Sequence, residues 1–61
     1  MFKYDVYLRD GRKVTLFATY FEVRATLPSD PLAMYFYDKE DCIVGYFNLT
    51  DVVGICGFKD D

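Results

Sequence analysis

Hydrophobic and polar residues alternate along most of the chain, and this period of two is typical of β-strands with one buried face. The apolar positions of the first segment, residues 2–9, share one face: Phe2, Tyr4, Val6 and Leu8. Asp10-Gly11 follows, and this dipeptide favours a tight hairpin because glycine tolerates a positive φ. Residues 13–19 alternate again, so the sequence predicts an antiparallel hairpin over residues 2–19.

The phase of the alternation changes after residue 19. The inward residues before this point are Val14, Leu16 and Ala18, whereas those after it are Phe21, Val23, Ala25 and Leu27. A shift by one residue moves the apolar side chains to the opposite face, so we expect a bulge or corner near Thr19-Tyr20. A helical turn over residues 19–26 is the alternative, although β-branched and aromatic residues disfavour it.

The rest of the chain reads as three short strands separated by turns. Two prolines place a loop at residues 27–31. The predicted strands are Leu32–Tyr37, Cys42–Phe47 and Val52–Phe58, with turns at residues 38–41 and 48–51. Five or six strands at this spacing predict an all-β fold, a small antiparallel meander closed as an SH3-like or Sm-like barrel or bent sheet. Residues 1–58 then form one β domain, and residues 59–61 form a solvated tail.

Aromatic residues are the unusual part of the composition. The 61-residue chain holds six Phe and six Tyr, and several strands are apolar on both faces. A chain of this length forms a single small core, which we do not expect to hold all twelve rings. Either the tyrosines lie flat on the surface with their hydroxyls in water, or some form a patch that binds a protein. We expect Tyr35, Tyr37 and Tyr46 to be the aromatic anchors of such a protein-binding patch.

The residues that most enzymes need are scarce. The chain has no His, which excludes Ser-His and Cys-His nucleophiles and His-containing zinc sites. Cys42 and Cys56 are fourteen positions apart and cannot form a four-thiolate metal site within one chain. We therefore expect no enzymatic activity, no metal site and no cofactor.

The start of the chain indicates a compartment. Residues 1–5 are charged and alternating, unlike a secretion signal, and no apolar run approaches the ~18 residues of a membrane-spanning helix. We therefore expect a reduced, cytoplasmic protein that does not bind membranes and has no Cys42–Cys56 disulfide.

Charge divides the chain into unequal halves. Residues 1–30 hold five Lys or Arg against four Asp or Glu, whereas residues 31–61 hold two against six. The acidic turn supplies Asp38, Glu40 and Asp41, which we expect to form the rim of a partner-binding surface. A basic cluster near the first hairpin offers an alternative nucleic-acid site composed of Tyr7, Arg9, Arg12, Lys13 and Phe17. Solvated hairpin charges are the simpler explanation of that cluster.

Two glycines interrupt the last predicted strand. Gly54 and Gly57 lie on either side of Ile55-Cys56. A glycine inside a strand marks a bulge or the close approach of another backbone, either a corner of the same fold or a second molecule. We expect Cys56 between them to be a small core residue.

Three segments resemble small uncharacterised proteins of phages and prophages of Gram-positive bacteria. They are Tyr4–Gly11, Tyr35–Asp38 and Gly45–Ile55. Those proteins end in a strand, an Asn-Leu-Ser/Thr-Asn/Asp turn and Val-Val-x-Ile, which matches residues 48–55 here. The resemblance implies a phage accessory protein, and short acidic proteins of this kind often inhibit a host enzyme or immunity component by binding it. No functional residue carries over, because the shared residues fit a turn and a core strand.

These observations predict a non-enzymatic protein-binding module. We expect it to self-associate and to inhibit a host defence protein by occlusion, in the host cytoplasm if it is phage-encoded. The alternatives are a small Sm-like or OB-like binder of nucleic acid or nucleotides, and a structural phage component that forms large symmetric assemblies.

Overall fold

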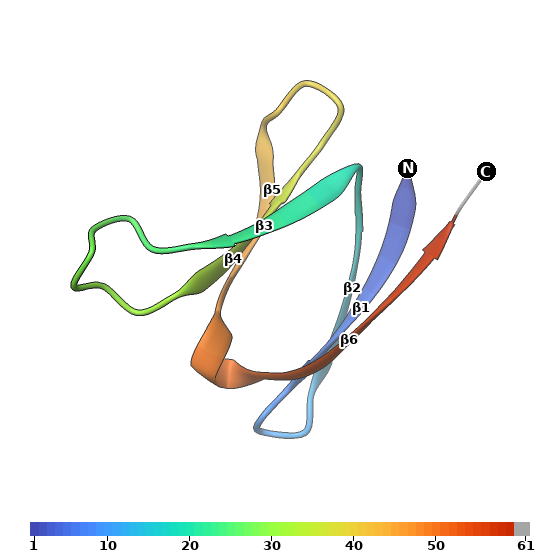
Figure 1. Ribbon diagram of the computed structural model, residues 1–61. Helices are drawn as coiled ribbons and strands as arrows, with labels where there is room; N and C mark the ends of the chain where they lie inside the picture. Colours follow the sequence, from blue (N-terminus) through green and yellow to red (C-terminus); the bar gives the residue numbers. More distant parts are fainter. Residues whose placement is uncertain (60–61) are drawn as a thin grey trace.

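The computed structural model describes residues 1–59, which form an all-β protein (Figure 1). Its elements are β1 (Phe2–Leu8), β2 (Lys13–Ala18), β3 (Tyr20–Arg24), β4 (Ala33–Tyr37), β5 (Ile43–Asn48), the short 3₁₀ helix η1 (Leu49–Asp51) and β6 (Val52–Lys59). Within the described residues no helix is long and apolar enough to cross a membrane.

The six strands form two antiparallel three-stranded sheets, in the orders β2-β1-β6 and β3-β4-β5. Figure 1 shows the two sheets as layers that the chain connects twice, directly from β2 into β3 and through η1 from β5 into β6. No strand pairing within residues 1–59 joins one sheet to the other. The predicted all-β class and antiparallel pairing are confirmed, whereas closure into a barrel is not.

The first hairpin forms as the sequence predicts. Tyr7 pairs with Lys13 at the end of the β1–β2 ladder, and Gly11 has a φ of 93°. The Gly11 N–H donates to the Leu8 carbonyl at 3.0 Å, and the Leu8 N–H donates to the Arg12 carbonyl at 2.8 Å. Glycine is therefore used here for its access to the left-handed region.

The predicted corner lies at Thr19, and residues 20–24 form a strand instead of a helical turn. The Thr19 N–H donates to the Tyr37 carbonyl at 2.7 Å, which fixes the corner against β4. The change of phase at this point turns Phe21 toward the core, where its ring packs on Tyr4 and Phe36.

The core lies between the sheets and is small. Its buried members are Tyr4, Val6, Ala18, Met34 and Phe36. Phe36 is fully buried, and its ring centroid lies 5.2 Å from that of Tyr4 and 5.9 Å from that of Phe47. All five residues of the central strand β4 are buried, but only Met34 and Phe36 belong to this core, whereas Ala33, Tyr35 and Tyr37 form a second cluster with Tyr20.

The last strand is one residue longer than predicted. β6 runs through Lys59, which pairs with Phe2, so the first residue of the predicted tail belongs to the sheet. Asp60 and Asp61 lie outside the described residues.

Candidate functional site

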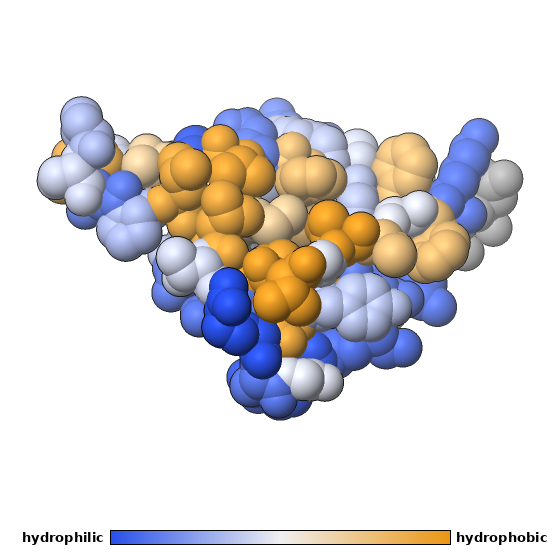
Figure 2. Space-filling model, turned by 60° about the horizontal axis from the view of Figure 1, so that its bottom comes forward, coloured by the Kyte–Doolittle hydropathy of each residue, from blue (hydrophilic) through white to orange (hydrophobic). Residues whose placement is uncertain are grey.

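Each sheet has an outer face, because the protein is only two layers thick and its Cα atoms span 38 × 29 × 12 Å. Large hydrophobic side chains are left exposed as a result: Met1, Phe2, Tyr7, Phe17, Phe21, Val23, Leu27, Leu32, Ile43, Val44, Tyr46, Val53 and Phe58. Six of the twelve aromatic rings are among them, which confirms that the core does not hold every ring. On the face drawn in Figure 2, hydrophobic surface gathers into a broad area beside strongly hydrophilic residues.

Tyrosines cover the outer face of the β3-β4-β5 sheet. Tyr20 stacks on Tyr37 with ring centroids 4.9 Å apart, and Tyr35 meets Tyr46 edge to face at 5.1 Å. The guanidinium carbon of Arg24 lies 4.1 Å from the centroid of the Tyr35 ring, and its Nη2 donates to the Tyr37 hydroxyl at 3.1 Å. Arg24 thus joins the two tyrosines of β4 into one layer.

This layer changes the interpretation of the three predicted anchors. Tyr35 and Tyr37 are each only 8% exposed, because Arg24 and the neighbouring tyrosine rings cover them. Tyr46 is 55% exposed. Of the three residues, only Tyr46 is available to a partner without rearrangement, and Tyr35 supports its ring from below.

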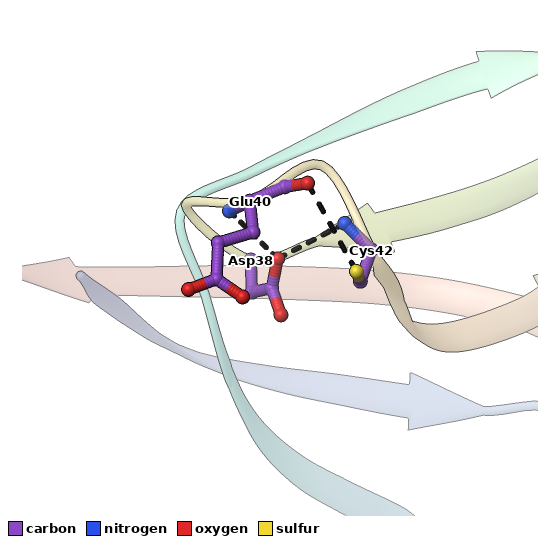
Figure 3. A group of neighbouring side chains, drawn as sticks. All are labelled: Asp38, Glu40 and Cys42. Atoms are coloured by element: carbon purple, nitrogen blue, oxygen red, sulfur yellow. Dashed lines mark hydrogen bonds between the residues drawn. The ribbon is translucent and has the colours of Figure 1, made fainter.

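The acidic turn lies between β4 and β5. The Oδ1 atom of Asp38 accepts the backbone N–H of Glu40 at 2.8 Å and that of Cys42 at 3.0 Å (Figure 3). A carboxylate oxygen of Asp38, a carboxylate oxygen of Glu40 and the Sγ of Cys42 lie within 4.8 Å of one another. Asp41 has a φ of 62°, in the left-handed region that aspartate tolerates in turns. The two backbone bonds give Asp38 a structural role in closing the turn.

Asp41 also connects the turn to the tyrosine layer. Its Oδ1 accepts the Tyr20 hydroxyl at 2.6 Å. This hydrogen bond, more than any other contact, raises the pKa of Tyr20 to about 12, because an ionised phenol could no longer donate to the carboxylate. Glu40 and Asp41 remain exposed, as a rim requires, whereas Asp38 is half-buried.

Exposed apolar residues connect this rim to Tyr46. Ile43 is 54% exposed and Val44 is 46% exposed, and both lie on β5 between the acidic turn and Tyr46. We name this stretch the β5 surface: Ile43, Val44 and Tyr46, with the acidic rim of Glu40 and Asp41. Neither Ile43 nor Val44 was a predicted site residue, although Val44 lies out of phase with the most apolar set of its strand.

A cleft opens at the other end of β5, beside the tip of the first hairpin. It has a volume of about 630 Å³, and its apolar lining includes Leu8, Val14 and Phe47. Arg9 and Arg12 line it with Tyr46, but both arginines are engaged: the Arg9 Nε donates to the Thr50 carbonyl at 2.9 Å, and Arg12 pairs with Asp10 at 2.7 Å. The backbone N–H of Arg12 lowers the pKa of Asp10.

The structure divides the predicted nucleic-acid residues into two groups. Arg9 and Arg12 line the cleft, whereas Tyr7, Lys13 and Phe17 lie on the outer face of the β2-β1-β6 sheet. On that face Lys3 pairs with Phe17 on one side and with Phe58 on the other.

This outer face holds two residues that the sequence prediction missed or placed wrongly. Phe58 is 53% exposed, and the uninterrupted apolar run of the last strand hides its alternation. Cys56, predicted to be in the core, is exposed because it pairs with Asp5 on the outward phase of β1. Asp5 itself is buried and accepts the Thr15 hydroxyl at 2.7 Å.

Comparison of the chain with protein-family models, with curated proteins and with solved structures gives no match in any of the three.

Proposed function

We propose that this chain is a non-enzymatic protein-binding module that self-associates and inhibits its partner by occlusion. The observation that carries the proposal is the exposure of thirteen large hydrophobic side chains among residues 1–59, against six large ones and two alanines that are buried. Extended apolar surface on a small protein is typical of interaction sites. The role agrees with that of the host-directed phage accessory proteins that the sequence resembles, which act in the host cytoplasm.

The β5 surface has the features of a partner site. Tyrosine is enriched among residues that dominate binding energy, and Tyr46 stands on a base of packed rings that limits its rearrangement on binding. Glu40 and Asp41 place negative charge beside the apolar strip, which favours a partner with basic residues around an apolar groove. Tyr35 and Tyr37 contribute as the support of this surface.

We also propose that the two sheets correspond to the halves of an SH3-like or Sm-like barrel. Three features of the topology support this: a single residue, Thr19, separates β2 from β3, η1 precedes the last strand, and β6 returns to pair with β1. In such an arrangement both outer faces are available to partners.

The test is capture of a partner from a bacterial lysate by the tagged chain, compared between two matched variants. Val44→Lys places a charge in the apolar strip, and Leu27→Ser changes a residue that is 59% exposed on a distant loop. We expect Leu27→Ser to capture a protein that Val44→Lys does not capture. The activity of that protein, once purified, should be inhibited by the original chain and by Leu27→Ser but not by Val44→Lys. Equal capture by both variants would contradict the assignment of the β5 surface.

A second function is favoured by one observation, the row Phe17–Lys3–Phe58 on the outer face of the β2-β1-β6 sheet. Exposed rings beside lysines can stack single-stranded bases and neutralise phosphates. Fluorescence anisotropy with a single-stranded oligonucleotide at two salt concentrations separates the two functions. Salt-sensitive binding that Phe17→Ser abolishes would favour the nucleic-acid function.

A further inference from the structure

The edge strand β6 leaves a long uncharged edge of its sheet open. Among residues 1–59 it is the longest strand and pairs with β1 alone, and its residues 52–58, like the shorter edge strand β5, contain no charged residue and no proline. Natural proteins protect such edges with charges, prolines or covering elements, because an open edge can pair with another strand. β3, by contrast, carries Glu22 and Arg24.

The hydrogen-bonding phase of β6 follows from the register of its neighbours. The Leu8 N–H donates toward β2, so the alternate residues Lys3 and Asp5 direct their backbone groups toward β6. Their partners Phe58 and Cys56 use their own backbone groups in these bonds. Ile55 and Gly57 therefore direct their N–H and C=O groups to the open edge.

The two glycines of β6 have different explanations. A Cβ atom on Gly57 would lie 3.1 Å from Cε1 of Tyr4, so the packing of the Tyr4 ring accounts for this glycine. A Cβ on Gly54 would meet only Cδ2 of Tyr7 at 4.0 Å, an ordinary contact, and no positive φ requires a glycine there. The register of the β1–β6 pairing shifts between Tyr7 and Leu8, directly beside Gly54. One copy of the chain nevertheless has room for a larger residue at the position of Gly54.

We propose that β6 pairs antiparallel with β6 of a second copy of this chain, about a two-fold axis at Cys56. This register places Gly54 opposite the partner's Phe58, so that the exposed ring covers the space above the glycine. Ile55 and Gly57 then exchange hydrogen bonds with the partner's Gly57 and Ile55. The β2-β1-β6 sheets of the two copies then form one continuous six-stranded sheet.

A second copy fits this edge better than an unrelated strand because the pattern is complementary to itself. Around Cys56 each glycine faces a larger apolar residue, Gly54 with Phe58 and Gly57 with Ile55. The pairing satisfies the backbone groups of the edge and covers Phe58, one of the exposed rings. This inference assigns a surface to the self-association in the proposed function and rests on that part of it alone.

The test uses size-exclusion chromatography with light scattering over a concentration series. The unchanged chain is expected to reach twice the mass of one copy. Gly54→Lys, which a single copy can accommodate, is expected to lose the dimer because it places a charge against the partner's Phe58. Val44→Lys, on the other sheet, is the matched control and should keep the dimer. Circular dichroism checks that both variants are folded.

A cross-link tests the register. Directly opposed residues of a non-hydrogen-bonded antiparallel pair have Cα atoms about 4.5 Å apart, which is within the range of a disulfide. In a Cys42→Ser chain, diamide should take up the two thiol hydrogens and leave a Cys56–Cys56 disulfide, seen as a dimer on a non-reducing gel. The proposal is overturned by a single copy at every concentration, by a dimer that Gly54→Lys leaves intact, or by a dimer without the Cys56 cross-link.

The two proposals fail separately. Loss of partner capture in Val44→Lys with the dimer intact supports the β5 surface, whatever happens at β6. Loss of the dimer in Gly54→Lys supports the β6 pairing, whatever protein is captured.

Discussion

The outer faces of the two sheets both carry aromatic residues at alternate positions, yet the rings on the central strand of one sheet are buried and those beside Lys3 on the other are exposed. On the β3-β4-β5 sheet, Tyr35 and Tyr37 are buried beneath Arg24 and neighbouring rings. On the β2-β1-β6 sheet, Phe17 and Phe58 flank Lys3 and remain about half exposed. Alternation places both sets of rings on an outer face, but the cross-strand neighbours decide whether a ring is buried.

The difference has a chemical cause. A tyrosine has a hydroxyl that can be satisfied at the edge of a covered layer, and here Arg24, Thr26 and Asp41 supply the partners of three such hydroxyls. A phenylalanine offers only its apolar faces, which need another apolar surface to cover them. Tyr35 and Tyr37 are therefore covered within one copy of the chain, whereas Phe17 and Phe58 are open to a second molecule.

The largest expected effect comes from removing a ring of the covered face. Tyr37→Ala should lower the free energy of unfolding by about 3 kcal/mol or more, because it leaves a cavity under Tyr20 and removes the acceptor of Arg24. Phe17→Ser on the open face should change it by only about 0.5 kcal/mol, as for other exposed positions. Urea denaturation followed by circular dichroism measures both.

A domain of this size has a stability of only a few kcal/mol, so Tyr37→Ala is expected to be largely unfolded. Tyr37→Leu, which keeps most of the volume, provides a folded intermediate case. Equal urea midpoints for Tyr37→Leu and Phe17→Ser, both unchanged from the original chain, would show that the two faces do not differ as described.

A smaller effect is expected from the residue that joins the tyrosines. Arg24→Met keeps an unbranched apolar chain but loses both the contact with the Tyr35 ring and the hydrogen bond to Tyr37. The urea midpoint should fall by less than in Tyr37→Leu and by more than in Phe17→Ser. Arg12→Met, which breaks an exposed ion pair with Asp10, is the matched control and should have almost no effect.

Most of the fold could be predicted from local patterns. The first hairpin follows from alternation and Asp10-Gly11, and the corner at Thr19 follows from the change of phase before Phe21. Local patterns do not determine whether the two sheets close into a barrel, because closure depends on how the two layers pack. The short strands leave that packing to a few long-range contacts, such as the bond from Thr19 to Tyr37.

The candidate site was less predictable than the strands. The sequence did not predict that Arg24 would cover Tyr35 and Tyr37. The position of Arg24 over these rings depends on the β3–β4 register across the loop at residues 25–32. The exposure of Phe58 was missed because an entirely apolar strand shows no alternation. Its phase becomes visible only through its pairing with Lys3.

The smallest effect concerns the hydroxyl at the border of the covered face. The pKa of Tyr20 is raised to about 12 by its hydrogen bond to Asp41, above the value of about 10 in an unfolded chain. The bond therefore stabilises the fold fully below pH 10, and this contribution is lost as the pH rises through 12.

Asp41→Asn should return the pKa of Tyr20 toward 10, measured by the ultraviolet absorbance of tyrosinate and assigned by difference from Tyr20→Phe. Glu22→Gln removes a nearby charge without touching the hydrogen bond and should shift the titration less. If Glu22→Gln lowered the pKa of Tyr20 as much as Asp41→Asn does, nearby charge and not the hydrogen bond would be the cause of the raised pKa. The hydrogen-bonded hydroxyl of Tyr20 would then no longer be a difference between the covered face and the open face.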